Sequence, residues 1–135
     1  MTTNRSMPPG GVIPEFAYPD AREAVDWLRK TFGFKERLRI GNHRAQLVFG
    51  NGSMIVTQRN DACEMAGHSV MVCVEDVDRH HQQAKEHGAQ IISPPADYPY
   101  GERQYTVKDP GGHYWTFSQT IADVDPDTWG GELFE

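Results

Sequence analysis

The sequence predicts an α+β fold made of two similar units, each a strand, a helix and three further strands. Two stretches carry this prediction because they show the same succession of signals. Each has an apolar strand, an aspartate, a helical pattern and then a glycine: Asp20 and Gly33 in the first stretch, Asp76 and Gly88 in the second. Each unit then ends on a Gly-rich turn that leads into a strand. Duplicated units usually pack as related halves with a shared groove for ligands.

In the first unit we expect a strand over Val12–Tyr18 and a helix that begins after Asp20. Asp20 with Glu23 three residues later has the form of a capping box. Apolar residues within this helix recur at helical spacing and predict one buried stripe: Ala21, Ala24, Val25, Leu28 and Phe32. The remaining strands of the unit are expected over residues 35–40, 44–49 and 53–58. The dipeptide Asn51-Gly52 indicates a type I′ hairpin turn before the last of them.

The second unit repeats this order. We expect its helix to begin after Asp76 or Asp78 and to end at Gly88. Its strands are expected over residues 69–74, 90–93, 104–107 and 113–119, with a loop rich in proline and tyrosine over residues 93–101.

The two ends of the chain lie outside the repeated units. Residues 1–11 are expected to form a loose arm. The acidic tail, residues 120–135, carries Trp129 and Phe134. We expect this tail to dock on the domain, because exposed aromatic side chains would cost solubility.

Composition limits the class of protein. A chain of 135 residues has the size of one domain. Its formal net charge of −6 argues against nucleic-acid binding, which needs a basic surface. No apolar run approaches the roughly 20 residues of a membrane helix, so no membrane partner is expected. Residues 1–11 lack an apolar signal region, which favours a cytoplasmic location.

Two further segments are more specific signals than the repeated pattern itself. One is Ala24-Val25-Asp26-Trp27-Leu28 followed by Phe32-Gly33-Phe34, and the other runs from Tyr105 through Asp109-Pro110-Gly111-Gly112-His113 to Trp115. With the repeated βαβββ pattern, they resemble the vicinal oxygen chelate superfamily, which contains glyoxalases, bleomycin-resistance proteins and extradiol dioxygenases. The resemblance covers residues 12 to about 119. The ending Trp129-Gly130 is similar to a bacterial glyoxalase-like subgroup.

The resemblance implies a single domain, residues 1–135, in which two βαβββ modules pair. The modules would be residues 12–58 and 68–119, followed by the tail 120–135. They would form a cup-shaped mixed sheet around a cavity, with the helices on the outside. Members of the superfamily are commonly homodimers, so a homodimer is expected.

Enzymatic members of the superfamily hold a divalent metal with one side chain from each of four strands, mostly His and Glu. The corresponding positions here are Ile13, Val56, Ser69 and Thr116. Such metals need imidazole, thiolate or carboxylate donors. Because all four positions lack them, we predict no metal and no cofactor.

His68 keeps a metal-dependent alternative open. It lies one residue from a ligand position, so a regular strand would turn it away from the cup. A β-bulge would turn it inward, where Glu15 could be a second ligand. The protein would then be a metal-dependent lyase, isomerase or dioxygenase.

The expected cup face holds the candidate site residues. Glu15 lies in an apolar strand, where its carboxylate is either solvated or free to act as a general base or to bind a cation. The predicted ligand-binding residues combine methionine, aromatic and polar side chains: Met54, Val56, Met71, Tyr100, Arg103, Tyr105 and Thr116. Aromatic faces with few polar groups suit a planar organic ligand. Alternatively, Arg103 pairs with a carboxylate and the tyrosines cover the sheet edge.

The sequence therefore favours a metal-free protein that binds a small aromatic or apolar molecule in the cup, as a drug-sequestering protein does. Two alternatives remain: the metal-dependent enzyme, and a metal-free enzyme with Glu15 as general base and Arg103 stabilising an enolate.

Overall fold

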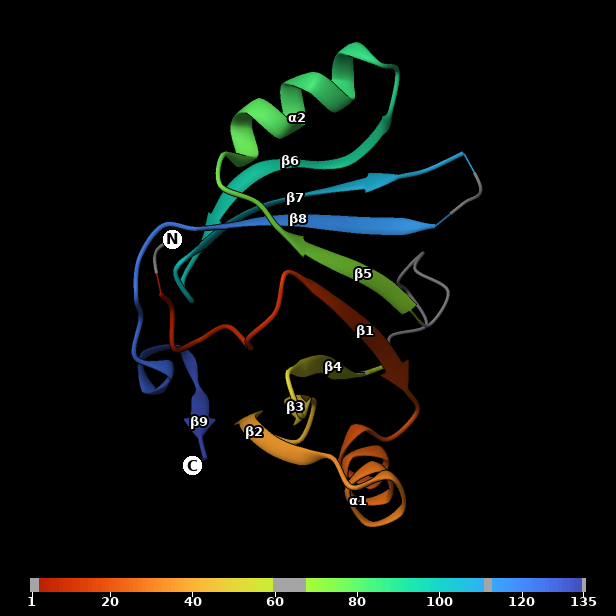
Figure 1. Ribbon diagram of the computed structural model, residues 1–135, viewed down its shortest axis with the longest axis vertical. Helices are drawn as coiled ribbons and strands as arrows, with labels where there is room; N and C mark the ends of the chain where they lie inside the picture. Colours follow the sequence, from red (N-terminus) through yellow and green to blue (C-terminus); the bar gives the residue numbers. More distant parts are fainter. Residues whose placement is uncertain (1–2, 60–67, 111–112, 135) are drawn as a thin grey trace.

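The computed structural model describes residues 3–59, 68–110 and 113–134, and shows one curved mixed sheet with two helices on its outside (Figure 1). The strand order is β6-β7-β8-β5-β1-β4-β3-β2-β9. In chain order the elements are β1 Val12–Tyr18, α1 Ala21–Phe32, β2 Lys35–Ile40, β3 Arg44–Phe49, β4 Gly52–Gln58, β5 His68–Cys73, α2 Val77–Glu86, β6 Gln90–Tyr98, β7 Glu102–Lys108, β8 Tyr114–Thr120, a 3₁₀ helix η1 Pro126–Trp129, and β9 Gly131–Leu133. Within the described residues, neither α-helix has the length and apolar character needed to span a membrane.

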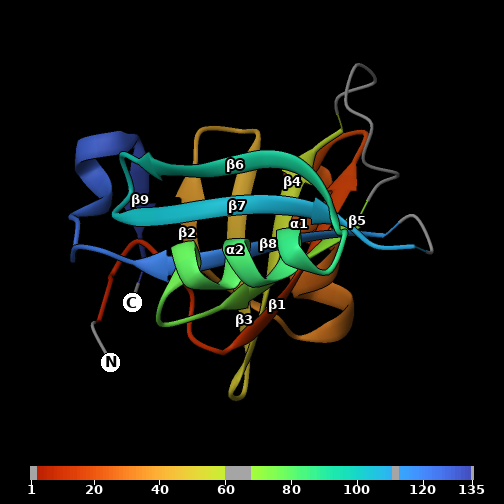
Figure 2. The ribbon, with the colours of Figure 1, turned by 90° about the horizontal axis from the view of Figure 1, so that it is seen from above.

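Two units with the same order of elements build the sheet. In each unit the first strand pairs in parallel with the last, β1 with β4 and β5 with β8. The units meet where β1 and β5 run antiparallel. The helices lie at opposite ends of the molecule, and α2 crosses the outer face of β6, β7 and β8 (Figures 1 and 2). This arrangement confirms the predicted α+β class.

Local capping signals fix both helices. The Asp20 side chain accepts a hydrogen bond from the Glu23 amide at 3.0 Å, and Asp76 accepts one from the Arg79 amide at 3.1 Å. The buried stripe of α1 packs on the sheet in a cluster of Ala21, Val25, Leu28, Ala45, Leu47, Met54 and Val56. Phe32, which was predicted to be part of this stripe, is instead 57% exposed at the last position of the helix.

The β3–β4 hairpin differs from the prediction by one residue. Phe49 pairs with Gly52, so the two loop residues are Gly50 and Asn51. Gly50 has a φ of 59°, whereas no non-glycine residue of the described chain has a positive φ. Glycine at the first central position belongs to a type II′ turn. The predicted type I′ turn at Asn51-Gly52 is therefore wrong.

The predicted loop over residues 93–101 is also wrong, because β6 continues as a strand to Tyr98. Pro94 and Pro95 cannot donate backbone hydrogen bonds, but β6 lies at the edge of the sheet, where proline is tolerated. Its pairing with β7 shifts register on both sides of Ser93.

The start of the chain, which was expected to be a loose arm, is anchored on the domain. Asn4 and Ser6 are 7% and 1% exposed. The Asn4 side-chain amide donates to the Glu102 carboxyl and to the Tyr100 carbonyl, each at 2.8 Å. The Ser6 hydroxyl donates to the Val124 carbonyl at 2.8 Å. These polar contacts join residues that are far apart in the sequence, so no local sequence pattern predicts them.

The tail docks on the domain, as predicted. Strand β9 extends the sheet beyond β2, and the Trp129 indole donates to the Ser6 hydroxyl at 2.7 Å. Gly101 is central to this docking because its carbonyl accepts from the Ile121 amide at 2.9 Å.

We predict that Gly101→Ala destabilises the protein by about 3 kcal/mol. Gly101 has a φ of +84°, and an added Cβ would lie 2.4 Å from the Ala122 carbonyl oxygen. Strain in the left-handed region and steric overlap both contribute. The control is Gly88→Ala, at a φ of +80° with open space around its Cβ, which should cost only about 1–2 kcal/mol. Equal losses in chemical denaturation would contradict the tight packing of the tail.

A partly buried histidine, His80, lies beside the core of the second unit. Val77, Tyr105 and Val107 are buried there, packed against Trp115 and Phe117 among others. The His80 ring lies 4.0 Å from the Phe117 ring, and its Nδ1 is 2.5 Å from the Tyr105 hydroxyl. Burial lowers the pKa of His80 below its ordinary value.

The lowered pKa of His80 predicts a loss of stability in mild acid. The unfolded chain binds a proton at the ordinary histidine pKa of about 6.5, whereas the folded chain resists it. Stability should therefore fall as the pH drops below about 6.5. We expect His80→Gln to reduce the slope of unfolding free energy against pH between about 5 and 7. Identical slopes in the wild-type protein and the variant would refute the role of His80.

Candidate functional site

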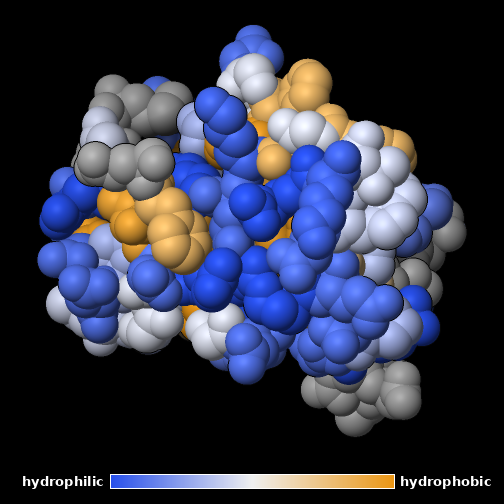
Figure 3. Space-filling view, turned by 90° about the horizontal axis from the view of Figure 1, so that it is seen from below, coloured by the Kyte–Doolittle hydropathy of each residue, from blue (hydrophilic) through white to orange (hydrophobic). Residues whose placement is uncertain are grey.

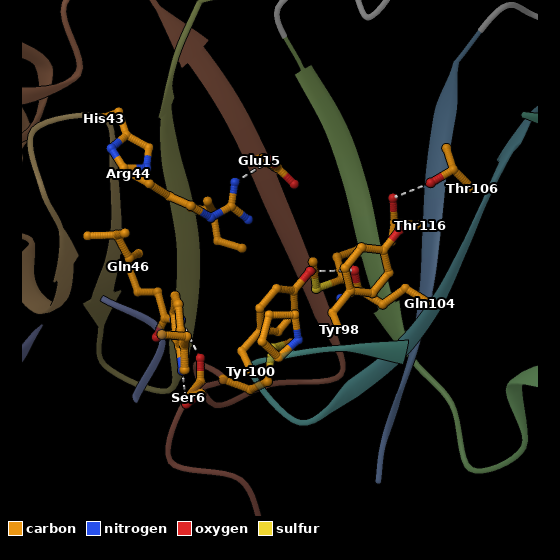
Figure 4. A pocket seen from close by; sticks show the side chains of 16 residues that line it. Ser6, Glu15, His43, Arg44, Gln46, Tyr98, Tyr100, Gln104, Thr106 and Thr116 are labelled. Atoms are coloured by element: carbon orange, nitrogen blue, oxygen red, sulfur yellow. Dashed lines mark hydrogen bonds and ion pairs between the residues drawn. The ribbon is translucent and has the colours of Figure 1, made fainter. Parts of the chain in front are cut away.

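A cavity of about 500 Å³ lies on the concave side of the sheet and is the candidate site (Figure 4). Both units contribute to its walls, together with the start of the chain and the tail. Its lining residues are Ser6, Met7, Glu15, Ile40, His43, Arg44, Gln46, Ile55, Met71, Tyr98, Pro99, Tyr100, Gln104, Thr106, Thr116 and Trp129.

The central strands form an apolar floor. Ile55 on β4 lies beside Glu15 on β1, and Met71 on β5 lies beside Thr116 on β8. Ile55 and Met71 pack with the fully buried Ile13 and with Met7 from the start of the chain. Of the residues that the sequence placed on the cup face, Glu15, Met71 and Thr116 on the strands and Tyr100 after β6 line the cavity.

Met54 and Val56 lie on the opposite face of β4, which corrects their predicted placement. Both belong to the cluster beneath α1. Neighbouring side chains of a strand point to opposite faces, so an error of one residue exchanges cavity and core. The residue of β4 that reaches the cavity floor is Ile55.

Arg103 and Tyr105 also point away from the cavity. Arg103 pairs with Asp78 of α2 at 3.0 Å and with Asp97 of β6 at 2.9 Å, as in the alternative considered from the sequence. Tyr105 is buried beneath α2. The residues of β7 that face the cavity are the alternating ones, Gln104 and Thr106. Arg103 is therefore not placed to stabilise an enolate in the cavity, as the metal-free enzyme alternative requires.

An ion pair forms the polar end of the cavity. The Arg44 guanidinium on β3 lies 3.0 Å from Glu15 Oε1 (Figure 4). The Ser69 hydroxyl lies 3.5 Å from Glu15 Oε2. The side chains of Glu15 and Arg44 are 15% and 32% exposed. Sequence reasoning missed Arg44, because its partner lies on a strand remote in sequence. Glu15 is consequently neither an isolated base in an apolar cup nor simply solvated.

Aromatic side chains form the opposite wall. The rings of Tyr98 and Tyr100 stack with centroids 5.6 Å apart, and Trp129 lies 5.4 Å from Tyr100. The Tyr100 hydroxyl donates to the Gln104 side-chain carbonyl at 3.0 Å. Burial raises the pKa of Tyr100 to about 12, so the phenol keeps its proton at neutral pH.

The side chains present do not fit the metal centre that the resemblance implies. Val56 faces the core beneath α1, so the residue of β4 at the cavity is Ile55, which is buried and apolar like Ile13. Ser69 contacts Glu15, and Thr116 contacts Thr106 at 3.2 Å. Hydroxyl groups alone do not supply the donor set that such a divalent metal requires. In the described part of the chain, no group of three His, Cys, Asp or Glu side chains is placed to hold an ion.

His68 does not assemble the alternative metal site with Glu15. It pairs with Phe16, while Glu15 pairs with Ser69, so His68 and Glu15 lie on opposite faces of regularly paired strands. His68 is exposed, and its ring lies 6.1 Å from that of His113. The bulge that would have turned it into the cup is absent from the described pairing of β1 and β5.

Comparison with known proteins agrees with the fold described above. The pattern of the Glyoxalase/Bleomycin resistance protein/Dioxygenase superfamily matches residues 14–117. An uncharacterized protein of Mycobacterium tuberculosis is 28% identical over 131 residues, which cover 84% of this chain and 76% of that protein.

Two solved structures show the same fold. A superfamily member from Vibrio splendidus is 17% identical with a TM-score of 0.62, and covers 82% of this chain and 97% of its own. The Mn(II)-bound glyoxalase from Novosphingobium aromaticivorans is 18% identical with a TM-score of 0.63, and covers 83% of this chain and 38% of its own. At these identities the likeness concerns the fold alone.

The ion pair in the cavity should be measurable by a double-mutant cycle. We expect Glu15→Gln and Arg44→Gln each to destabilise the protein, with a coupling energy of about 1 kcal/mol between them. The matched comparison is the exposed pair Arg5 and Asp123, whose coupling should be smaller and should vanish in high salt. A coupling near zero for Glu15 and Arg44 would show that the pair does not persist in solution.

Proposed function

Because the chain belongs to the Glyoxalase/Bleomycin resistance protein/Dioxygenase superfamily, we propose that it binds a small planar aromatic molecule in its cup without a metal ion. One observation carries the proposal: the cavity joins an aromatic wall to an apolar floor where metal ligands would otherwise converge. Binding without chemical change, as in the sequestering of a drug, is the activity that these side chains support best.

The lining suits such a ligand in size and chemistry. A cavity of about 500 Å³ lies within the range of sites for small organic molecules. Tyr98, Tyr100 and Trp129 offer ring surfaces for stacking. Met7 and Met71 belong to the apolar floor, and their polarizable side chains adapt to different ring shapes.

We predict that the fluorescent bicyclic probe quinolin-2(1H)-one binds the protein and raises its unfolding temperature. At 100 times its dissociation constant, the ligand should add about 2.7 kcal/mol of stability. Tyr98→Ala removes a ring that is 38% exposed at the cavity and should weaken binding by about tenfold. Phe16→Ala removes a ring that is 39% exposed and does not line the cavity, and it should leave affinity unchanged. Equal effects of the two substitutions would place binding elsewhere.

The same titration tests whether a metal participates. Protein prepared without affinity tag or chelator should contain no stoichiometric zinc, nickel, iron or manganese, and EDTA should leave the affinity for the probe unchanged. Stoichiometric metal that is lost in Glu15→Ala or His68→Ala would refute metal-free binding.

We also propose that the protein is a homodimer. Trp129 is not available for the contact, because it packs within the chain against Ser6 and Tyr100. Exposed rings gather instead near the end of α1, where Trp27, Phe32 and Phe49 are 53%, 57% and 58% exposed. Figure 3 shows the α1 end of the molecule, where hydrophobic patches interrupt a mainly hydrophilic face. Burial of such apolar patches is what a self-complementary interface provides.

Sedimentation at micromolar concentration tests this assembly. We expect twice the chain mass of 15.2 kDa, and we expect Trp27→Arg to shift the protein toward the monomer. The control Thr31→Arg adds the same charge at an exposed position of α1 and should keep the dimer. A wild-type protein that sediments as a monomer would rule out the proposal.

A further inference from the structure

We propose that the cavity selects neutral ligands that present a hydrogen-bond acceptor and a donor side by side, as a cyclic amide does. This inference rests on the proposed function and names the class of ligand. In the expected arrangement the ligand carbonyl accepts from Arg44, and the neighbouring N–H donates to the Glu15 carboxylate.

Both members of the ion pair have hydrogen-bonding capacity left. An ionised carboxylate offers about four acceptor positions. Glu15 uses one of them for Arg44 at 3.0 Å and one for a long contact to Ser69 at 3.5 Å. A guanidinium has five N–H donors. Among the residues that the structure describes, Glu15 is the one hydrogen-bond partner of the Arg44 side chain. Figure 4 shows Glu15 and Arg44 together among the side chains that line the cavity, and the Arg44 side chain is 32% exposed.

Charge favours a neutral occupant. The pair is neutral as a whole, and its two groups lie only 3.0 Å apart. A ligand with a net charge would be attracted by one group, repelled by the other, and stripped of its hydration in a partly buried site. A neutral amide satisfies the donor and the acceptor together and leaves the pair intact.

The remaining walls set the shape of the ligand. The Tyr98 and Tyr100 rings stand across the cavity from Arg44 (Figure 4). A flat ring placed against them can direct one edge toward Glu15 and Arg44. A planar aromatic with the amide built into that edge therefore uses both ends of the site.

Titration calorimetry with a set of bicyclic probes of similar size tests the inference. The set contains quinolin-2(1H)-one, with adjacent N–H and carbonyl, and its isomer quinolin-4(1H)-one, in which these groups lie on opposite sides of the ring. It also contains 2-naphthoate as anion, N-methylquinolinium as cation, and naphthalene. We expect quinolin-2(1H)-one to bind at least tenfold more tightly than each of the others. In Arg44→Met, which keeps an aliphatic side chain, this preference should disappear.

The outcomes separate the inference from the function on which it rests. Tighter binding of 2-naphthoate, of N-methylquinolinium or of the 4-isomer would overturn the inference. Equal affinity for all five probes would also overturn it, but would leave aromatic binding in the cup intact. If none of the probes binds, the proposed function fails and the inference fails with it. The probe series uses the wild-type protein, so it does not depend on the folding of the variant.

Discussion

The buried carboxyl group of Glu102 holds together the parts of the chain that shape the cavity. Its side chain is fully buried and accepts hydrogen bonds from Asn4 at 2.8 Å, Ser118 at 2.6 Å and Thr120 at 2.7 Å. Ser118 in turn accepts from Gln104 at 2.9 Å. No buried side-chain polar atom of the described residues lacks a partner. A satisfied buried network of this kind favours a single arrangement, because a partly satisfied one is costly.

The start of the chain connects the Glu102 network to the first unit and to the tail. Asn4 joins it to the second unit through Glu102. The Ser6 carbonyl accepts from Gln46 of the first unit at 2.7 Å, and the Ser6 hydroxyl accepts from Trp129 of the tail at 2.7 Å. One short segment thus contacts both units and the tail at one end of the cavity. The aromatic wall and the polar end are consequently held in a fixed relation before any ligand arrives.

The sequence predicted what is encoded locally. The helix after Asp20 and the order of strands follow from capping and periodicity, which act over a few residues. The anchored start was not predictable in this way, because Asn4 bonds to Glu102, which lies 98 residues further along the chain. The cavity face of β4 was missed by one residue, since hairpin register decides it. The pairing of Glu15 with Arg44 needed the three-dimensional order of strands. The candidate site was therefore predicted in its general chemistry and only in part of its residues.

The central claim is that a planar aromatic molecule binds on the concave side of the sheet, and the methionines test it most directly. Met7 and Met71 line the cavity, whereas Met54 lies beneath α1 on the other face. The measurement is a titration of protein labelled with ¹³C at the methionine methyl groups, followed by NMR as quinolin-2(1H)-one is added. Large ring-current shifts at Met7 and Met71, with Met54 unchanged, are the predicted result. Shifts confined to Met54, or no shift at saturating probe, would contradict the account.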